Sequence, residues 1–167
     1  MLAEYNDLAS VERLFQKDAA SIAAILVEPV CGSMGVVTPE EDFLPGLKAI
    51  AERHGALLIF DEVITGFRVA YGGAQNLYGI KPDLTCLGKA LGGGMPIGAY
   101  GGSRQIMSQL MPDGAVYQAG TFSGNPVTMA GGVATLDLLK DESHYLRMEA
   151  RASELFAGLS KLKTKAG

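Results

Sequence analysis

The sequence predicts an α/β fold, in which a mostly parallel sheet carries helices on both faces. Short continuous apolar runs alternate along the chain with amphipathic segments of helical period, and the apolar runs end in polar residues. Strands joined through helices form right-handed crossovers, so the strands lie parallel and ligands bind outside their carboxyl ends. A chain of 167 residues is long enough to bury a core as one domain.

Four apolar runs are the predicted strands. The first, at residues 22–30, and the second, at residues 56–63, are apolar until they reach acidic residues, as expected for strands buried on both faces. Two shorter runs at residues 83–88 and 97–102 follow after glycine-containing turns. Polar residues therefore gather where these strands end.

Capping residues mark the predicted helices between and after the strands. Asn6 is the predicted N-cap of the first helix, and Asp42 is the predicted N-cap of the second, which Gly55 ends. The pair Asn125 and Pro126 predicts the start of a helix that runs to residue 139. A last helix is predicted at residues 142–163.

Charge and hydropathy exclude several classes of partner. The net charge is −4, and the basic residues are scattered, which argues against binding to nucleic acid. No apolar window reaches the length of a membrane span. The short basic tail of Lys161, Lys163 and Lys165 is expected to be a solvated helix end.

Cysteine and histidine usage points to a cytoplasmic protein without a metal site. Cys31 and Cys86 are far apart and form no C-x-x-C pair, which suggests reduced thiols. His54 and His144 have no neighbours at metal-ligand spacing. We therefore expect no bound metal.

An acid and a lysine follow two successive predicted strands. Buried charges are costly unless they are paired, so Asp61 and Lys89 at such positions suggest a ligand. Lysine forms imines with carbonyls, and a carboxylate beside a pyridine nitrogen keeps that nitrogen protonated. Val63 points the same way as Asp61, so a flat ring could lie on it. Taken singly, each residue is more easily explained as a solvated lysine and a turn-capping acid, but together they predict pyridoxal phosphate.

Several motifs resemble the class III aminotransferases, which have the fold-type I large domain of pyridoxal-phosphate transferases. FDEVITGFR (60–68) and LGKALGGGMPIGAYGG (87–102) resemble the cofactor signature of this family. YNDL (5–8), VAYGGAQ (69–75) and VYQAGTFSGNP (116–126) resemble its aminomutases more than its ω-amino-acid transaminases. The resemblance covers nearly the whole chain.

The resemblance implies roles for residues beside the cofactor. Lys89 would be the Schiff-base lysine and proton shuttle, Asp61 would hold the pyridinium, and Val63 would pack on the ring. Ser33 stands where the family has an asparagine that contacts the phenolic oxygen, so its contact would be direct or through a water. Glu28 either supports this pocket or caps a turn.

The resemblance also implies a homodimer. Gly120 and Thr121 would bind the cofactor phosphate of the neighbouring subunit, and Tyr117 would lie at the same interface. Backbone amides and a hydroxyl before a helix do form phosphate sites. From the sequence alone, a plain turn before a capped helix is the better explanation of Gly120 and Thr121.

The implied activity is an intramolecular amino transfer that converts glutamate-1-semialdehyde, an amino-aldehyde, to 5-aminolevulinate in tetrapyrrole (porphyrin) biosynthesis. Pyridoxal phosphate would be the cofactor and would pass through its pyridoxamine form. Two alternatives stay open: a class III ω-amino-acid transaminase, and a catalytically inactive fragment with only a binding or dimerisation role. Residues 1–167 would form part of the large domain, without the family's N-terminal segment and C-terminal small domain.

Overall fold

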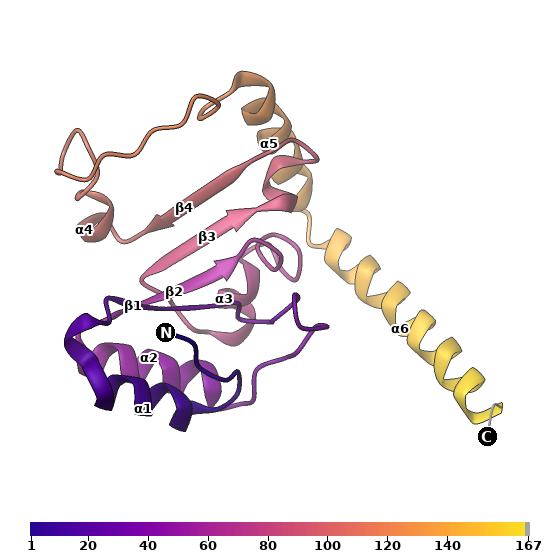
Figure 1. Ribbon diagram of the computed structural model, residues 1–167. Coiled ribbons are helices and arrows are strands. Elements are labelled where there is room, and N and C mark those ends of the chain that lie inside the picture. Colours follow the sequence, from indigo (N-terminus) through magenta and orange to yellow (C-terminus); the bar gives the residue numbers. More distant parts are fainter. Residues whose placement is uncertain (166–167) are drawn as a thin grey trace.

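Four strands lie side by side in chain order in the computed structural model, which describes residues 1–165 (Figure 1). β1 (Ala24–Val27) and β2 (Leu57–Glu62) are parallel, as are β2 and β3 (Leu84–Gly88). β4 (Gly98–Gly102) runs antiparallel to β3. Only a short link joins β3 to β4, too short for the crossover that a parallel pair needs. The predicted α/β fold with a mostly parallel sheet is confirmed.

Helices flank this sheet, and most of them lie where the sequence predicts them. Two short helices, α3 and α4, were not predicted, because so few residues show no helical period. The elements outside the sheet are α1 (Leu8–Asp18), η1 (Ala19–Ser21), α2 (Phe43–His54), α3 (Gly73–Tyr78), η2 (Lys89–Gly92), α4 (Arg104–Met107), α5 (Pro126–Leu139) and α6 (Ser143–Lys165).

The core lies between β2 and the helices α1 and α2. Burial alternates along β2: Leu58, Phe60 and Glu62 are fully buried, whereas the residues between them are half-buried. Leu26 of β1 is 65% exposed. The expectation that β1 and β2 are buried on both faces is therefore wrong for the described chain, because the helices that build the core cover one face of β2. The core cluster comprises Val11, Phe15, Phe43, Leu44, Leu47, Ile50, Ala51, Ala56, Leu58 and Phe60.

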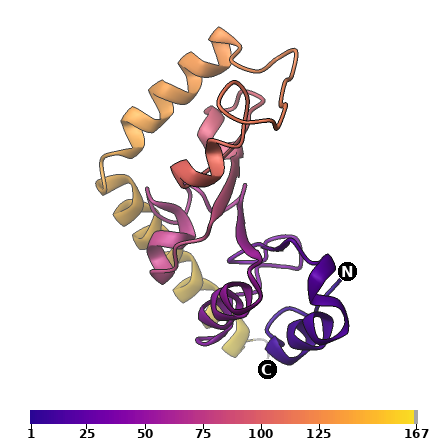
Figure 2. The ribbon, with the colours of Figure 1, turned by 90° about the vertical axis from the view of Figure 1, so that its left-hand side faces the viewer.

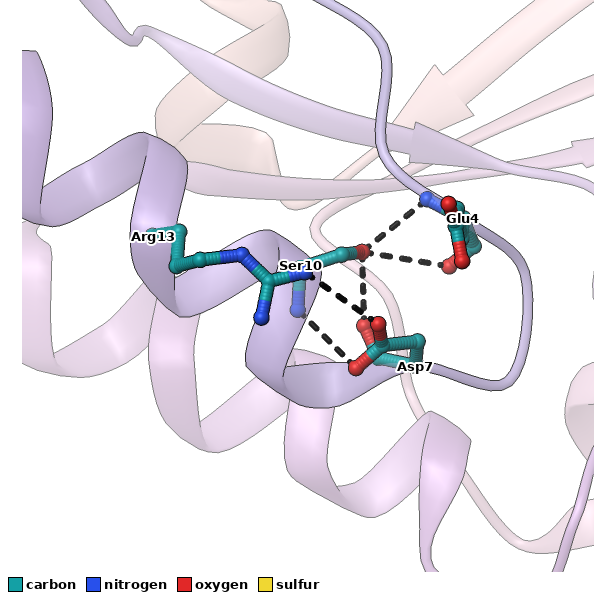
Figure 3. Close-up of polar contacts among 4 residues, drawn as sticks. All are labelled: Glu4, Asp7, Ser10 and Arg13. Atoms are coloured by element: carbon teal, nitrogen blue, oxygen red, sulfur yellow. Dashed lines mark hydrogen bonds and ion pairs between the residues drawn. The ribbon is translucent and has the colours of Figure 1, made fainter.

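Asp7, and not Asn6, caps α1. The Oδ1 atom of Asp7 accepts a hydrogen bond from the Ser10 amide at 3.0 Å, as Figure 3 shows. The Ser10 hydroxyl donates to the Asp7 carbonyl and accepts from the Glu4 amide, and Arg13 forms an ion pair with Asp7 (Figure 3). This cluster joins the start of α1 to the segment that precedes it.

Asn6 does not cap α1, because its backbone is left-handed, with φ of 63°. A capping residue needs an extended backbone, which Asn6 lacks. Its side chain instead accepts from the Glu40 amide at 3.0 Å and donates to the Thr38 carbonyl at 3.1 Å. The prediction of Asn6 as the cap is wrong, and the residue ties α1 to the loop before α2.

The predicted ends of α2 and α5 are at the expected residues, and α6 lies within two residues of its predicted bounds. Asp42 precedes α2, although its side chain makes no capping hydrogen bond, and Gly55 ends the helix with φ of 68°. Asn125 caps α5 by accepting from the amides of Val127 and Thr128.

α6 leaves the rest of the molecule as a long helix, which both ribbon views show (Figures 1 and 2). Near its start, the Tyr145 hydroxyl donates to the carbonyl of Phe67 at 3.1 Å. Within residues 1–165, no helix has the length and apolar character to cross a membrane. The side chains of Lys163 and Lys165 lie outside the described residues, so the predicted tail stays a prediction.

Candidate active site

Asp61 lies at the carboxyl end of β2, opposite Cys86 of β3. Its Oδ1 atom accepts a hydrogen bond from the Val63 amide at 3.0 Å, and no hydrogen bond to Oδ2 occurs within the described residues. Burial, and then the charge of Asp61, raise the pKa of the Cys86 thiol. Asp61 therefore presents one carboxylate oxygen that is free to bind a ligand.

Val63 packs beside the residue that precedes Lys89. A Cβ atom placed on Gly88 would lie 3.3 Å from Cγ1 of Val63 and 3.3 Å from the carbonyl of Ile97. Gly88 thus makes room for this close approach. The structure brings Asp61, Val63 and the backbone of Lys89 together at the ends of neighbouring strands, as the sequence predicts.

Lys89 is exposed and is the first residue of η2. Its φ of 42° is left-handed, which is unusual for a residue other than glycine. It lines a surface hollow together with residues from three other segments, including Phe67, Thr135 and Met148. Within residues 1–165, no hydrogen bond or ion pair engages its amine.

Among the glycines that follow Lys89, Gly93 allows α5 to pack on η2. A Cβ on Gly93 would overlap Oγ1 of Thr135 and lie 2.9 Å from the Gly131 carbonyl. A Cβ on Gly132 would lie 2.9 Å from the Leu91 carbonyl. Of the three glycines at residues 92–94, Gly93 thus admits α5 against η2, and only Gly94 faces open space.

Ser33 belongs to a small cluster around Glu28, just after β1. Its hydroxyl donates to Oε1 of Glu28 at 2.7 Å, and the Gly32 amide donates to Oε2 at 3.0 Å. The hydrogen bond from Ser33 lowers the pKa of Glu28, against the opposing effect of burial. Of the two roles left open for Glu28, the structure shows the turn-capping one. The Ser33 hydroxyl hydrogen is engaged by Glu28.

Gly120, Thr121 and Tyr117 lie on the exposed segment between α4 and α5, and within the described residues no hydrogen bond or ion pair joins them to Asp61 or Lys89. The Ser123 amide donates to the Gly120 carbonyl at 2.9 Å, which forms a turn just before α5. Tyr117 is 76% exposed. These residues do not complete the site around Asp61 within the described chain, and their assignment to a neighbouring subunit's site stays a prediction.

Glu62 is a buried charged residue that sequence reasoning missed. Its carboxylate is fully inaccessible and accepts hydrogen bonds from the Thr65 hydroxyl, the Ala74 and Gln75 amides, and the Gln75 side chain. The period of two in β2 was a usable signal, because it places Glu62 on the same face as Leu58 and Phe60.

Taken together, these residues offer a free carboxylate oxygen, an apolar side chain and a primary amine at one edge of a sheet. Such a set suits a flat heteroaromatic ring that carries an aldehyde: the acid faces a ring nitrogen, and the amine faces the aldehyde. The chemistry of the donors therefore fits pyridoxal phosphate.

Known proteins resemble this chain along nearly its whole length. The class-III aminotransferase family model matches residues 3–166. A glutamate-1-semialdehyde 2,1-aminomutase of Pelotomaculum thermopropionicum is 56% identical over all 167 residues, and one of Nitratidesulfovibrio vulgaris is 61% identical over 153 residues, 92% of the chain. The chain spans 38% and 36% of the lengths of these two relatives.

A solved structure described as a transaminase with PLP bound has a TM-score of 0.79 at 35% identity. That match covers 85% of this chain and 34% of the transaminase. The family model and the relatives extend over nearly every residue of the chain, including the segments that carry Asp61 and Lys89. The chain belongs to the class-III aminotransferase family.

Proposed function

We propose that this chain forms the cofactor-binding core of a glutamate-1-semialdehyde 2,1-aminomutase, which makes 5-aminolevulinate for tetrapyrrole synthesis. The observation that carries the proposal is the placement of Asp61 and Lys89 at the ends of neighbouring strands, in a chain 56% identical along its whole length to a protein of that name. The chain spans 38% of that relative, so the large domain and the activity are proposed for the longer protein of which these residues are the core.

The proposed cofactor is pyridoxal phosphate, which the transaminase of similar structure is described as binding. When bound, it supplies an electron sink for a carbanion at the carbon that loses a proton. Asp61 would hold a proton at the ring nitrogen through its free carboxylate oxygen, and Val63 would support one face of the ring. Because the Ser33 hydroxyl donates to Glu28, Ser33 would contact the phenolic oxygen through an intervening water.

Lys89 would bind the aldehyde carbon of the cofactor through its amine, and it would move protons at the substrate. Its exposure leaves the amine accessible to both cofactor and substrate. The carbon that receives an amino group and the carbon that loses one belong to the same amino-aldehyde molecule. Lys89 can therefore serve as the base and the acid in succession without a second substrate.

We propose a homodimer in which Gly120, Thr121 and Tyr117 approach the neighbouring subunit's cofactor phosphate. Their exposure before α5 leaves their backbone amides and side chains accessible for such a contact. The cysteines Cys31 and Cys86 are both free thiols, which supports the proposal of a cytoplasmic protein.

The first experiment incubates the purified chain with pyridoxal phosphate, records the visible band, reduces with borohydride and maps the labelled peptide. A stable label on Lys89, lost in Lys89→Ala and weakened in Asp61→Ala, is the expected result. The full-length protein then should form 5-aminolevulinate from the semialdehyde alone. Labelling spread over surface lysines would contradict the cofactor assignment.

A class III transaminase is the second candidate, because the solved structure with a TM-score of 0.79 is described as a transaminase. The two activities share this core and differ in their need for a second amino substrate. Turnover that requires an added amino donor and acceptor would favour the transaminase. A full-length protein that binds no cofactor would leave only a binding or dimerisation role.

A further inference from the structure

We propose that Glu62 is a positioning residue that sets the direction of Asp61 and Val63 toward Lys89; this inference rests on the proposed function of that site. The Glu62 carboxylate is buried directly after Asp61, where an isolated charge would be very costly. The structure assigns it four donors, so the charge is well solvated by the protein itself.

The donors to Glu62 come from the two ends of one loop. Thr65 lies at the beginning of the loop and donates to Oε2 at 3.0 Å. Ala74 and Gln75, at the start of α3, donate their amides at 2.5 and 2.9 Å. A Cβ on Gly73, which has φ of 70°, would overlap the carboxylate. Glu62 thus closes the loop 63–75 onto the end of β2.

The same residue fixes the turn that orients Asp61. The Glu62 carbonyl accepts from the Gly66 amide at 2.8 Å, which holds the peptide between residues 62 and 63 in one direction. The amide of that peptide belongs to Val63 and donates to Asp61. A rotation of the turn would therefore rotate the Asp61 carboxylate.

A second set of contacts extends this control to β3. Gln75 donates one hydrogen bond to Glu62 and another to Oγ1 of Thr85, at 3.3 Å. Val63 packs on Gly88, next to Lys89. The loop that Glu62 closes is thereby held against the strand that delivers the lysine.

Replacing Glu62 itself would leave several buried amides unpaired and could unfold the chain, so the test removes one donor. Thr65→Val keeps the shape of the side chain and deletes its hydrogen bond. The matched control is Asp83→Asn, because Asp83 accepts from the Leu58 amide and pairs with Lys48 near the starts of the same two strands. Asp83→Ala replaces it if a larger loss of melting temperature is needed for the match.

Two measurements are made on the 167-residue chain. The first is binding of pyridoxal phosphate, with its dissociation constant and the pH midpoint of its visible band. Thr65→Val should weaken binding about fivefold and shift the midpoint, whereas Asp83→Asn should change neither. The second is hydrogen exchange of the Val63 amide without cofactor, which Thr65→Val should accelerate about fivefold.

Equal effects of the two variants on binding, at equal loss of melting temperature, would overturn the inference and leave Glu62 a stability anchor. If the unmodified chain binds no pyridoxal phosphate, the proposed function fails, and the exchange of Val63 alone then decides whether Glu62 orients the turn. Exchange at Val63 that is the same in both variants would overturn it.

Discussion

At the scale of the residue, Lys89 combines a reactive amine with an unfavourable backbone. Its φ of 42° places the residue after β3 in the left-handed region, which costs a non-glycine residue about 1–2 kcal/mol. Residues held in such conformations cluster at functional sites, where the surrounding structure over-determines them. Here the packing of Val63 on Gly88 and of α5 on Gly93 supplies that constraint.

The strain at Lys89 makes one prediction about stability. The free energy of unfolding of Lys89→Gly should exceed that of Lys89→Ala by about 1 kcal/mol, because glycine adopts a positive φ without penalty. Urea unfolding of the two variants measures this difference. Neither variant should take a borohydride-stable label at this position. Equal stability of the two variants would show that the backbone at residue 89 is not strained.

Tyr5 should make stability depend on pH in the alkaline range. Burial is the main cause that raises its pKa from 10.0 to about 12. Its neutral hydroxyl donates to the carbonyls of Glu28 and Pro29. The folded state holds the proton more tightly, so this stabilisation is complete below pH 10 and is lost as the pH rises toward 12.

Tyr5→Phe isolates this contribution from the other tyrosines whose pKa values are raised, Tyr78 and Tyr145. The difference in unfolding free energy between the unmodified chain and the variant should be constant below pH 10 and should shrink above it. A difference that stays constant up to pH 12 would contradict the assigned role of Tyr5.

Ser33 should control the acidity of Glu28. The hydrogen bond from Ser33 is the main cause that lowers the pKa of Glu28 below 4.5. Ser33→Ala should raise that pKa, and less stability should then be lost as the pH falls through it. Carboxyl NMR titration measures the shift. Ser108→Ala, which deletes a hydroxyl bonded to the Gln105 carbonyl, is the control and should leave Glu28 unchanged.

At the scale of the element, the contact between η2 and α5 locks the turn that carries Lys89. Gly93 and Gly94 both have positive φ, of 59° and 96°, so a side chain strains the backbone at either position. They differ in their surroundings, because a Cβ on Gly93 would overlap Thr135 and a Cβ on Gly94 meets no atom within 4 Å. Comparing the same substitution at Gly93 and at Gly94 therefore distinguishes the cost of steric overlap from the cost of backbone strain.

Gly93→Ala should destabilise the chain more than Gly94→Ala, by about 1–3 kcal/mol from overpacking against α5. It should also weaken binding of pyridoxal phosphate, since the turn of Lys89 must shift. Urea unfolding and titration of the visible band measure the two effects. Gly94→Ala with the larger effect would mean that α5 yields to the new side chain.

The elements that the sequence predicted are those with local signals. Apolar runs located all four strands, and Gly55 and Asn125 marked helix ends through their own backbone and side chain. The cap of α1 was assigned one residue too early, because the left-handed backbone of Asn6 depends on contacts with Thr38 and Glu40, far along the chain. Short helices such as α3 depend on tertiary contacts, here those of Glu62.

The candidate site also contains both residues that the local sequence predicts and contacts that only the folded chain reveals. Asp61, Val63 and Lys89 follow from strand ends and spacing, which are local properties of the sequence. The role of the glycines after Lys89 could not be read from it, because their neighbours Gly131 and Thr135 lie about forty residues further on. The contact between Ser33 and Glu28 likewise appears only once the loop after β1 is folded.

At the scale of the whole molecule, apolar side chains remain on the surface of both long C-terminal helices. α5 exposes Val127, Val133 and Leu138. α6 exposes Leu146, Leu155, Phe156, Leu159 and Leu162. Exposed apolar surface of this kind promotes association.

The 167-residue chain should therefore associate as its concentration rises, which sedimentation velocity measures. Replacing Leu155 and Leu159 together by lysine should reduce association, because both side chains are at least half exposed. The control replaces Ser153 and Ala157 by lysine, with the same added charge and the same spacing on α6. An unmodified chain that stays monomeric with a sharp thermal transition would contradict this prediction.

α5 begins just after the turn of Gly120 and Thr121, and its middle packs on the turn of Lys89. Its 14 residues form a rod about 21 Å long. A displacement at one end of a rigid helix moves the whole helix. In the proposed dimer, those two turns belong to different active sites, so α5 would carry displacement from one cofactor's phosphate to the other cofactor's lysine.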